Sequence, residues 1–120
     1  MTDDSQTIAL VNDAAAGNAS AVSELFARYR ERLLRMVAYR IDGRLQGRVD
    51  PADVVQEALI VASDRLADYA KRRPLPFYLW LRQITREQLV HAHEQHVQAE
   101  KRSVTRECDP GVPLSARLTG

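Results

Sequence analysis

Apolar residues recur at intervals of three and four along most of the chain, which is the spacing of one face of an α-helix. We therefore predict an all-α protein, a compact bundle of about four helices. The first helix runs from about residue 5 to residue 16 and ends at Gly17. The second opens at Asn18, whose side chain suits the cap position, and keeps an apolar face along its length.

The third helix has the most sharply specified start, at Asp50-Pro51. Asp50 can accept hydrogen bonds from the free amides of the first turn, and proline fits the first helical position because its missing N–H is not needed there. Asp53 adds negative charge where the helix dipole favours it. The helix is expected to reach about Ala70, with one stripe facing the core: Val55, Leu59, Ala62, Leu66 and Tyr69.

The opposite face of this helix is acidic with an apolar residue in its middle. At about 100° per residue, four side chains fall together there, with Gln56 at the edge and Val54 beside the core stripe. The four are Asp53, Glu57, Ile60 and Asp64. Two interpretations remain open: an ordinary solvated surface, or a docking face for a basic partner.

Two segments interrupt the helical pattern. Gly43 and Gly47 predict a loop over residues 42–49, and the two prolines of Lys71-Arg72-Arg73-Pro74-Leu75-Pro76 exclude a continuous helix. The three adjacent cations suit the negative end of the preceding helix dipole, and they equally suit contact with phosphates.

The last helix starts near Pro76 and extends to about residue 103. Its first half has a packed side and its second half turns polar, so we expect the second half to project from the bundle. The packed side comprises Phe77, Trp80, Leu81, Ile84, Gln88 and His91. The other side interleaves cations with rings and an aliphatic group, an arrangement typical of single-stranded nucleic-acid sites. These residues are Tyr78, Leu79, Arg82, Arg86 and His93.

The chain carries no motif for catalysis or for a cofactor. Of His91, His93 and His96, only the last two have a spacing that brings two imidazoles to one ion, and we predict no metal site. No nucleophile elbow, phosphate-binding glycine loop or zinc-protease motif is present, so we expect a binding protein rather than an enzyme. The lone cysteine, Cys108, allows no internal disulfide and fits a reducing, cytoplasmic setting.

Length and charge distribution refine this picture. At 120 residues the chain is large enough for one core, which we assign to residues 1–104, with 105–120 as a linker or tail. The formal charge of +1 hides a separation: residues 1–70 hold 8 Lys/Arg against 11 Asp/Glu, whereas residues 71–120 hold 9 against 5. One face for a basic protein and another for phosphates would suit this separation. We expect neither an export signal nor a membrane span.

Three motifs in order resemble region 2 of bacterial RNA polymerase sigma factors of the sigma-70 family, most closely the extracytoplasmic-function (ECF) subfamily. They are Gly17-Asn18 before the long arginine-rich helix, Asp50-Pro51-Ala52-Asp53-Val54-Val55-Gln56-Glu57, and Phe77-Tyr78-Leu79-Trp80-Leu81-Arg82-Gln83-Ile84-Thr85-Arg86. The resemblance covers roughly residues 6–103. It implies a domain for transcription initiation.

The resemblance also assigns roles. The third helix would dock on the β′ clamp helices of core RNA polymerase, which implies core-binding roles for Asp53, Val54, Gln56, Glu57 and Ile60. The loop and helix after it would read and melt the promoter −10 element and hold its non-template strand. This implies DNA-binding roles for Lys71, Arg72, Arg73, Phe77, Tyr78, Trp80, Arg82, Gln83 and Arg86. For Trp80 a core role competes with the DNA role. An anti-sigma factor is left open as a further partner.

Two features depart from the family pattern. Glu87 stands where members often have asparagine, and its charge repels phosphates. The second domain, a helix-turn-helix that binds the −35 element, is absent, and the tail resembles an interdomain linker cut partway. A helical protein-interaction module, or a regulator that does not read DNA, is therefore the alternative function.

Overall fold

The computed structural model describes residues 3–41 and 48–107, with side chains as far as residue 102. These residues form four helices: α1 (Ser5–Ala15), α2 (Ala19–Arg40), α3 (Pro51–Arg72) and α4 (Phe77–Glu107). The all-α bundle is confirmed, and each predicted helix is present within a few residues of its expected ends. Most of the predicted loop at 42–49 and of the tail at 105–120 lies outside the described residues.

A side chain at the cap position starts each of the first three helices, and two of these caps, Asn18 and Asp50, were predicted. Asp4 Oδ1 accepts a hydrogen bond from the Thr7 amide at 2.7 Å, Asn18 Oδ1 from Ala21 at 3.1 Å, and Asp50 Oδ1 from Ala52 at 2.9 Å. Between α1 and α2 the backbone turns at Gly17, whose φ of 102° lies in the region that glycine tolerates without strain. Local sequence signals therefore set these boundaries.

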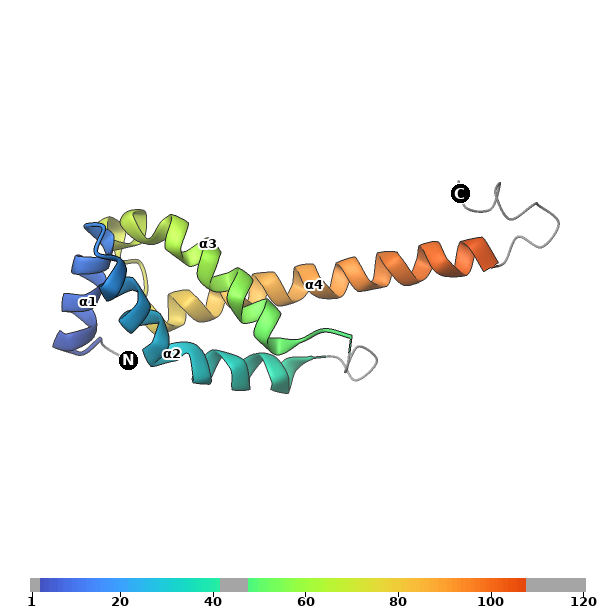
Figure 1. The fold of residues 1–120 in the computed structure, drawn as a ribbon, viewed down its shortest axis with the longest axis horizontal. Helices are drawn as coiled ribbons and strands as arrows, with labels where there is room; N and C mark the ends of the chain where they lie inside the picture. Colours follow the sequence, from blue (N-terminus) through green and yellow to red (C-terminus); the bar gives the residue numbers. More distant parts are fainter. Residues whose placement is uncertain (1–2, 42–47, 108–120) are drawn as a thin grey trace.

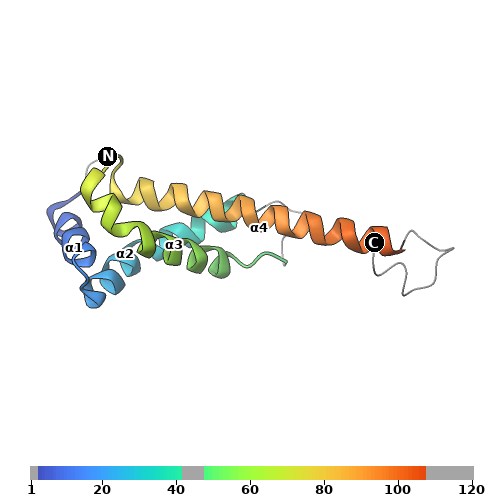
Figure 2. The ribbon, with the colours of Figure 1, turned by 90° about the horizontal axis from the view of Figure 1, so that it is seen from above.

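Figure 1 shows α2 and α3 beside the first half of α4, with α1 across one end of the bundle and the second half of α4 extending beyond the other helices. Figure 2 shows the same projection from above. The expected projection of the last helix is confirmed. Its physical reason is the end of the apolar stripe: Leu89 is the last buried core residue of α4, and the described residues after it are mostly polar. None of the described helices combines the length and apolar character needed to span a membrane.

The core lies where the four helices meet. Leu25, Leu33 and Val37 of α2 face Val55, Ala62 and Leu66 of α3, all with at most 2% of their surface exposed. The residues of α4 in this core are Phe77, Leu81, Ile84 and Leu89. Two buried hydroxyls are satisfied: Thr7 Oγ1 shares a 2.8 Å hydrogen bond with the Tyr29 hydroxyl, and Thr85 Oγ1 donates to the Leu81 carbonyl at 2.7 Å.

Candidate interaction surfaces

The outward face of α3 is exposed as the sequence predicts. Asp53, Gln56 and Glu57 are exposed, and Ile60 keeps 49% of its surface in solvent. An isoleucine half in water among polar side chains leaves about half of its burial free energy unused by the fold. The four side chains form one surface, which we call the α3 face.

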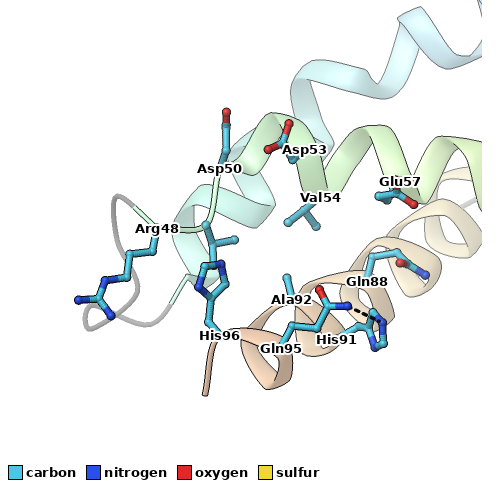
Figure 3. Close-up of a pocket in the computed structure, with 11 residues that line it drawn as sticks. Arg48, Asp50, Asp53, Val54, Glu57, Gln88, His91, Ala92, Gln95 and His96 are labelled. Atoms are coloured by element: carbon cyan, nitrogen blue, oxygen red, sulfur yellow. Dashed lines mark hydrogen bonds between the residues drawn. The ribbon is translucent and has the colours of Figure 1, made fainter. Parts of the chain in front are cut away.

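Val54 does not belong to the α3 face. Only 4% of its surface is exposed, because it lies about 100° around the helix from Asp53, on the side toward α4. In Figure 3 its side chain points toward Ala92 of α4. Val54 therefore packs between α3 and α4, and it has almost no exposed surface for a partner to contact.

A groove of about 520 Å³ separates the start of α3 from the middle of α4. Figure 3 shows Asp53 and Glu57 on the α3 side and Gln88, His91 and Gln95 on the α4 side. Gln95 Nε2 and His91 Nε2 lie 3.3 Å apart, within hydrogen-bonding distance. Arg48 points away from the groove and pairs with Glu100. The α3 side of the groove is therefore acidic.

On its other side the α3 face borders a hollow of about 340 Å³ between α2 and α3. Gln56 and Ile60 line it together with three residues that the sequence did not assign to a site: Phe26, Arg30 and Leu59. Phe26 and Leu59 are half-buried, so apolar surface remains available there. Their three-four spacing identified them as core residues, and no sequence signal distinguished a core residue from the wall of a hollow.

The basic segment at the end of α3 combines exposed cations with a constrained backbone. Lys71 and Arg72 are exposed, and Arg72 Nε lies 3.3 Å from Asp68 Oδ1. Arg73 ends the helix in the left-handed conformation with a φ of 41°, and its amide donates to the Tyr69 carbonyl at 2.7 Å. Its guanidinium donates to Asn12 Oδ1 of α1. Arg73 therefore ties the loop to the first helix, while Lys71 and Arg72 remain accessible.

Phe77 lies in the core, although the resemblance implied a DNA contact. None of its surface is exposed, and its ring centroid is 5.6 Å from those of Tyr29 and Tyr69. Trp80 is half-buried and stacks on Tyr69, with centroids 4.4 Å apart and planes inclined by 29°. Packing thus accounts for Phe77 fully, while Trp80 is only partly buried.

Tyr78 and Arg82 were expected to point away from the packed side, and the structure corrects this expectation. Tyr78 is half-buried and stacks on Tyr29 of α2 at a centroid distance of 5.9 Å. The Arg32 guanidinium carbon lies 3.8 Å from the Tyr78 ring centroid, a cation–π contact. Arg82 is also half-buried, and its Nε is buried without a hydrogen-bond partner. For Tyr78 the reason is the position of α2, whose Tyr29 and Arg32 contact its ring.

Gln83, Arg86 and Glu87 are exposed polar residues in the first half of α4. Gln83 and Arg86 are three residues apart and lie on one side of the helix. Glu87 follows directly, so the negative charge expected to disfavour phosphates is present on the surface. Together with Lys71 and Arg72, Gln83 and Arg86 are the predicted DNA-binding residues that are fully accessible.

A cavity of about 270 Å³ lies against the loop between α3 and α4. The Tyr69 hydroxyl donates to the Leu75 carbonyl at 2.5 Å beside it, which fixes the loop backbone. The sequence did not point to one of the lining residues, Asp3, because nothing local to residue 3 signals a contact with a helix that begins at residue 77. The cavity is lined by Asp3, Ile8, Tyr69, Arg73, Pro74, Leu75 and Pro76.

Tyr69 makes the stability of this end of the bundle sensitive to alkaline pH. Burial, helped by the nearby Asp3 carboxylate, raises the pKa of Tyr69 to about 12 from its ordinary 10.0. The raised pKa means that the folded protein favours the neutral phenol. The contribution of Tyr69 to the free energy of unfolding is therefore complete below pH 10.0 and is lost as the pH rises toward 12. We expect the unfolding free energy to fall by about 1 kcal/mol more between neutral pH and about pH 11 in the wild type than in Tyr69→Phe.

Urea unfolding of both proteins at the two pH values measures this difference. Tyr69→Phe also lacks the hydrogen bond to Leu75, so the comparison uses the change with pH within each protein. If the free energy of unfolding fell equally in the two proteins between neutral and alkaline pH, the assignment of this effect to Tyr69 would be contradicted.

The three histidines do not form a metal cluster. In the part of the chain that the structure describes, no group of three or more His, Cys, Asp or Glu side chains is placed to hold an ion. His93 is half-buried, with a buried Nε2 that has no hydrogen-bond partner.

The chain was compared with known proteins at the level of families, curated sequences and solved structures. No family model matches it, and neither a curated protein nor a solved structure gives a significant match.

Proposed function

We propose that this chain is a sigma-factor region 2 domain that binds the β′ clamp helices of core RNA polymerase and recognises and melts the promoter −10 element. The observation that carries the proposal is the α3 face, where Asp53, Gln56, Glu57 and Ile60 are exposed together. Packing within the bundle does not require these side chains there. A basic helical partner would meet complementary charge on this face and apolar surface in the adjoining hollow.

The accessible cations support the nucleic-acid part of the proposal. Lys71, Arg72 and Arg86 offer positive charge, and Trp80, which is only partly buried, is an aromatic side chain on which a base could stack. Asp53 and Lys71 are about 27 Å apart along α3 at the rise of an α-helix. The domain would therefore hold polymerase at one end of α3 and the non-template strand at the other, without competition between them.

Under this proposal the chain contributes binding and no chemistry. The polymerase supplies catalysis, and stacking on the domain offsets part of the free energy needed to unpair bases. Few phosphates are contacted, so binding to isolated DNA is weak and sensitive to salt. The protein acts in the cytoplasm, and an anti-sigma factor that covers either surface would inhibit it.

The test is a selection from a randomised pool of labelled single-stranded DNA, using the full chain together with a β′ clamp-helix fragment. Enrichment of one sequence motif, and its loss when the chain is omitted, is the expected result. Binding to the clamp fragment without sequence enrichment at low salt would instead favour the alternative, a helical protein-interaction module that does not read DNA, which the exposed Glu87 favours. Absence of clamp binding would contradict the sigma-factor function.

A further inference from the structure

The start of α4 is capped by a residue from the other end of the sequence. The Phe77 amide donates to both carboxylate oxygens of Asp3, at 3.0 and 3.1 Å. The residue before Phe77 is Pro76, whose side chain offers no acceptor for a cap. The first turn of α4 therefore depends on Asp3 for this hydrogen bond, across 74 residues of sequence.

Asp3 brings a negative charge into a basic neighbourhood. Among the described residues that line the cavity at the loop, Asp3 is the only acid and Arg73 the only cation. Lys71 and Arg72 precede Arg73 and are exposed. A backbone amide at the start of a helix and a nearby guanidinium are groups that also bind phosphate oxygens. The Asp3 carboxylate thus occupies a position that suits an anion in the middle of the proposed DNA-binding loop.

We propose that Asp3 is an autoinhibitory contact: its carboxylate competes with a nucleic-acid phosphate for the Phe77 amide and for the charge of the basic loop. This inference rests on the proposed function of that loop. A strand that binds there must displace Asp3 or bear its repulsion, so the N-terminal segment lowers the affinity of the domain for DNA.

A purely structural cap would behave differently, and asparagine separates the two roles. Its side-chain oxygen caps helices about as well as that of aspartate, but it carries no charge. Asp3→Asn therefore keeps the acceptor for the Phe77 amide and removes the competition. Asp4→Asn is the matched control, because Asp4 is the next residue, carries the same charge and caps α1.

The experiment measures the affinity of the full chain for a short labelled single-stranded DNA over a series of salt concentrations. Asp3→Asn should bind about three- to tenfold more tightly at low salt. Its plot of log affinity against log salt should be steeper by about 0.7, the increment for one additional phosphate contact on a single strand. Asp4→Asn should stay within about twofold of the wild type with an unchanged slope.

Three results would overturn the inference. Unchanged or weaker binding by Asp3→Asn would make Asp3 a cap only. Equal increases in DNA affinity in Asp3→Asn and Asp4→Asn would indicate a general effect of net charge rather than competition at one position. If neither the wild type nor any variant binds DNA at low salt, the proposed DNA recognition fails and the inference fails with it. Asp3→Ala, compared by thermal unfolding, reports the contribution of the cap separately.

Discussion

Glu57→Lys is expected to abolish detectable binding to the β′ clamp helices in a pull-down while leaving the helical content unchanged. Glu57 is exposed on the α3 face, so reversing its charge disturbs no packing. Against a basic partner, an attraction becomes a repulsion in the middle of the interface. Such a change weakens binding by more than about thirtyfold, or about 2 kcal/mol.

The control for this prediction is Glu24→Lys. Glu24 is an exposed carboxylate on α2, outside both the α3 face and the hollow beside it. Glu24→Lys should bind the clamp helices like the wild type, because it changes the net charge as much as Glu57→Lys does but leaves the α3 face intact. If Glu57→Lys bound the clamp helices as well as the wild type, the assignment of the α3 face as the docking surface would be wrong. A similar loss in both variants would reduce the effect to long-range electrostatics.

Phe77→Ala is expected to lower the free energy of unfolding by about 3–5 kcal/mol, the loss typical of a buried aromatic ring replaced by alanine. The ring is fully buried and lies within 5.7 Å, centroid to centroid, of three other aromatic rings. Its removal leaves a cavity where α2, α3 and α4 meet. Urea unfolding followed by circular dichroism measures the change.

Two further variants assign this loss to packing. Phe77→Leu restores most of the apolar volume and should recover a large part of the lost stability. Arg86→Gln, on the exposed side of α4, should leave stability within about 0.5 kcal/mol of the wild type. If Phe77→Ala stayed as stable as the wild type and lost only DNA binding, the role implied by the family resemblance would be correct and the core role wrong.

The helix boundaries were predictable because their signals are local. Asp50 and Pro51 start α3 through groups within the first turn, and Gly17 separates α1 from α2 by its own backbone freedom. The exposure of the α3 face followed from helical periodicity alone. What that face binds did not follow, because exposed carboxylates have the same periodicity on a solvated surface and on a docking surface.

The environment of α4 was less predictable, because it depends on neighbours distant in sequence. A helical wheel placed Tyr78 and Arg82 on the outward side, but Tyr29 and Arg32 of α2 cover Tyr78, and Arg82 is half-buried. The same wheel placed Trp80 on the packed side, and its stacking on Tyr69 confirms the packing role, although Trp80 is only partly buried. The capping of α4 by Asp3 has no local signal at all.

The fourth helix is held in the core only in its first half. This half packs around Phe77 and as far as Leu89, and the second half extends beyond the bundle (Figure 1), where Glu100 pairs with Arg48. The stretch from Leu89 to Glu107 measures about 27 Å at the rise of an α-helix. A tilt of about 5° in the packed half would move the far end by roughly 2 Å. The second half would therefore act as a lever arm, because a small repacking of Tyr69, Phe77 and Trp80 on ligand binding would displace Glu107 by more than it displaces the packed residues.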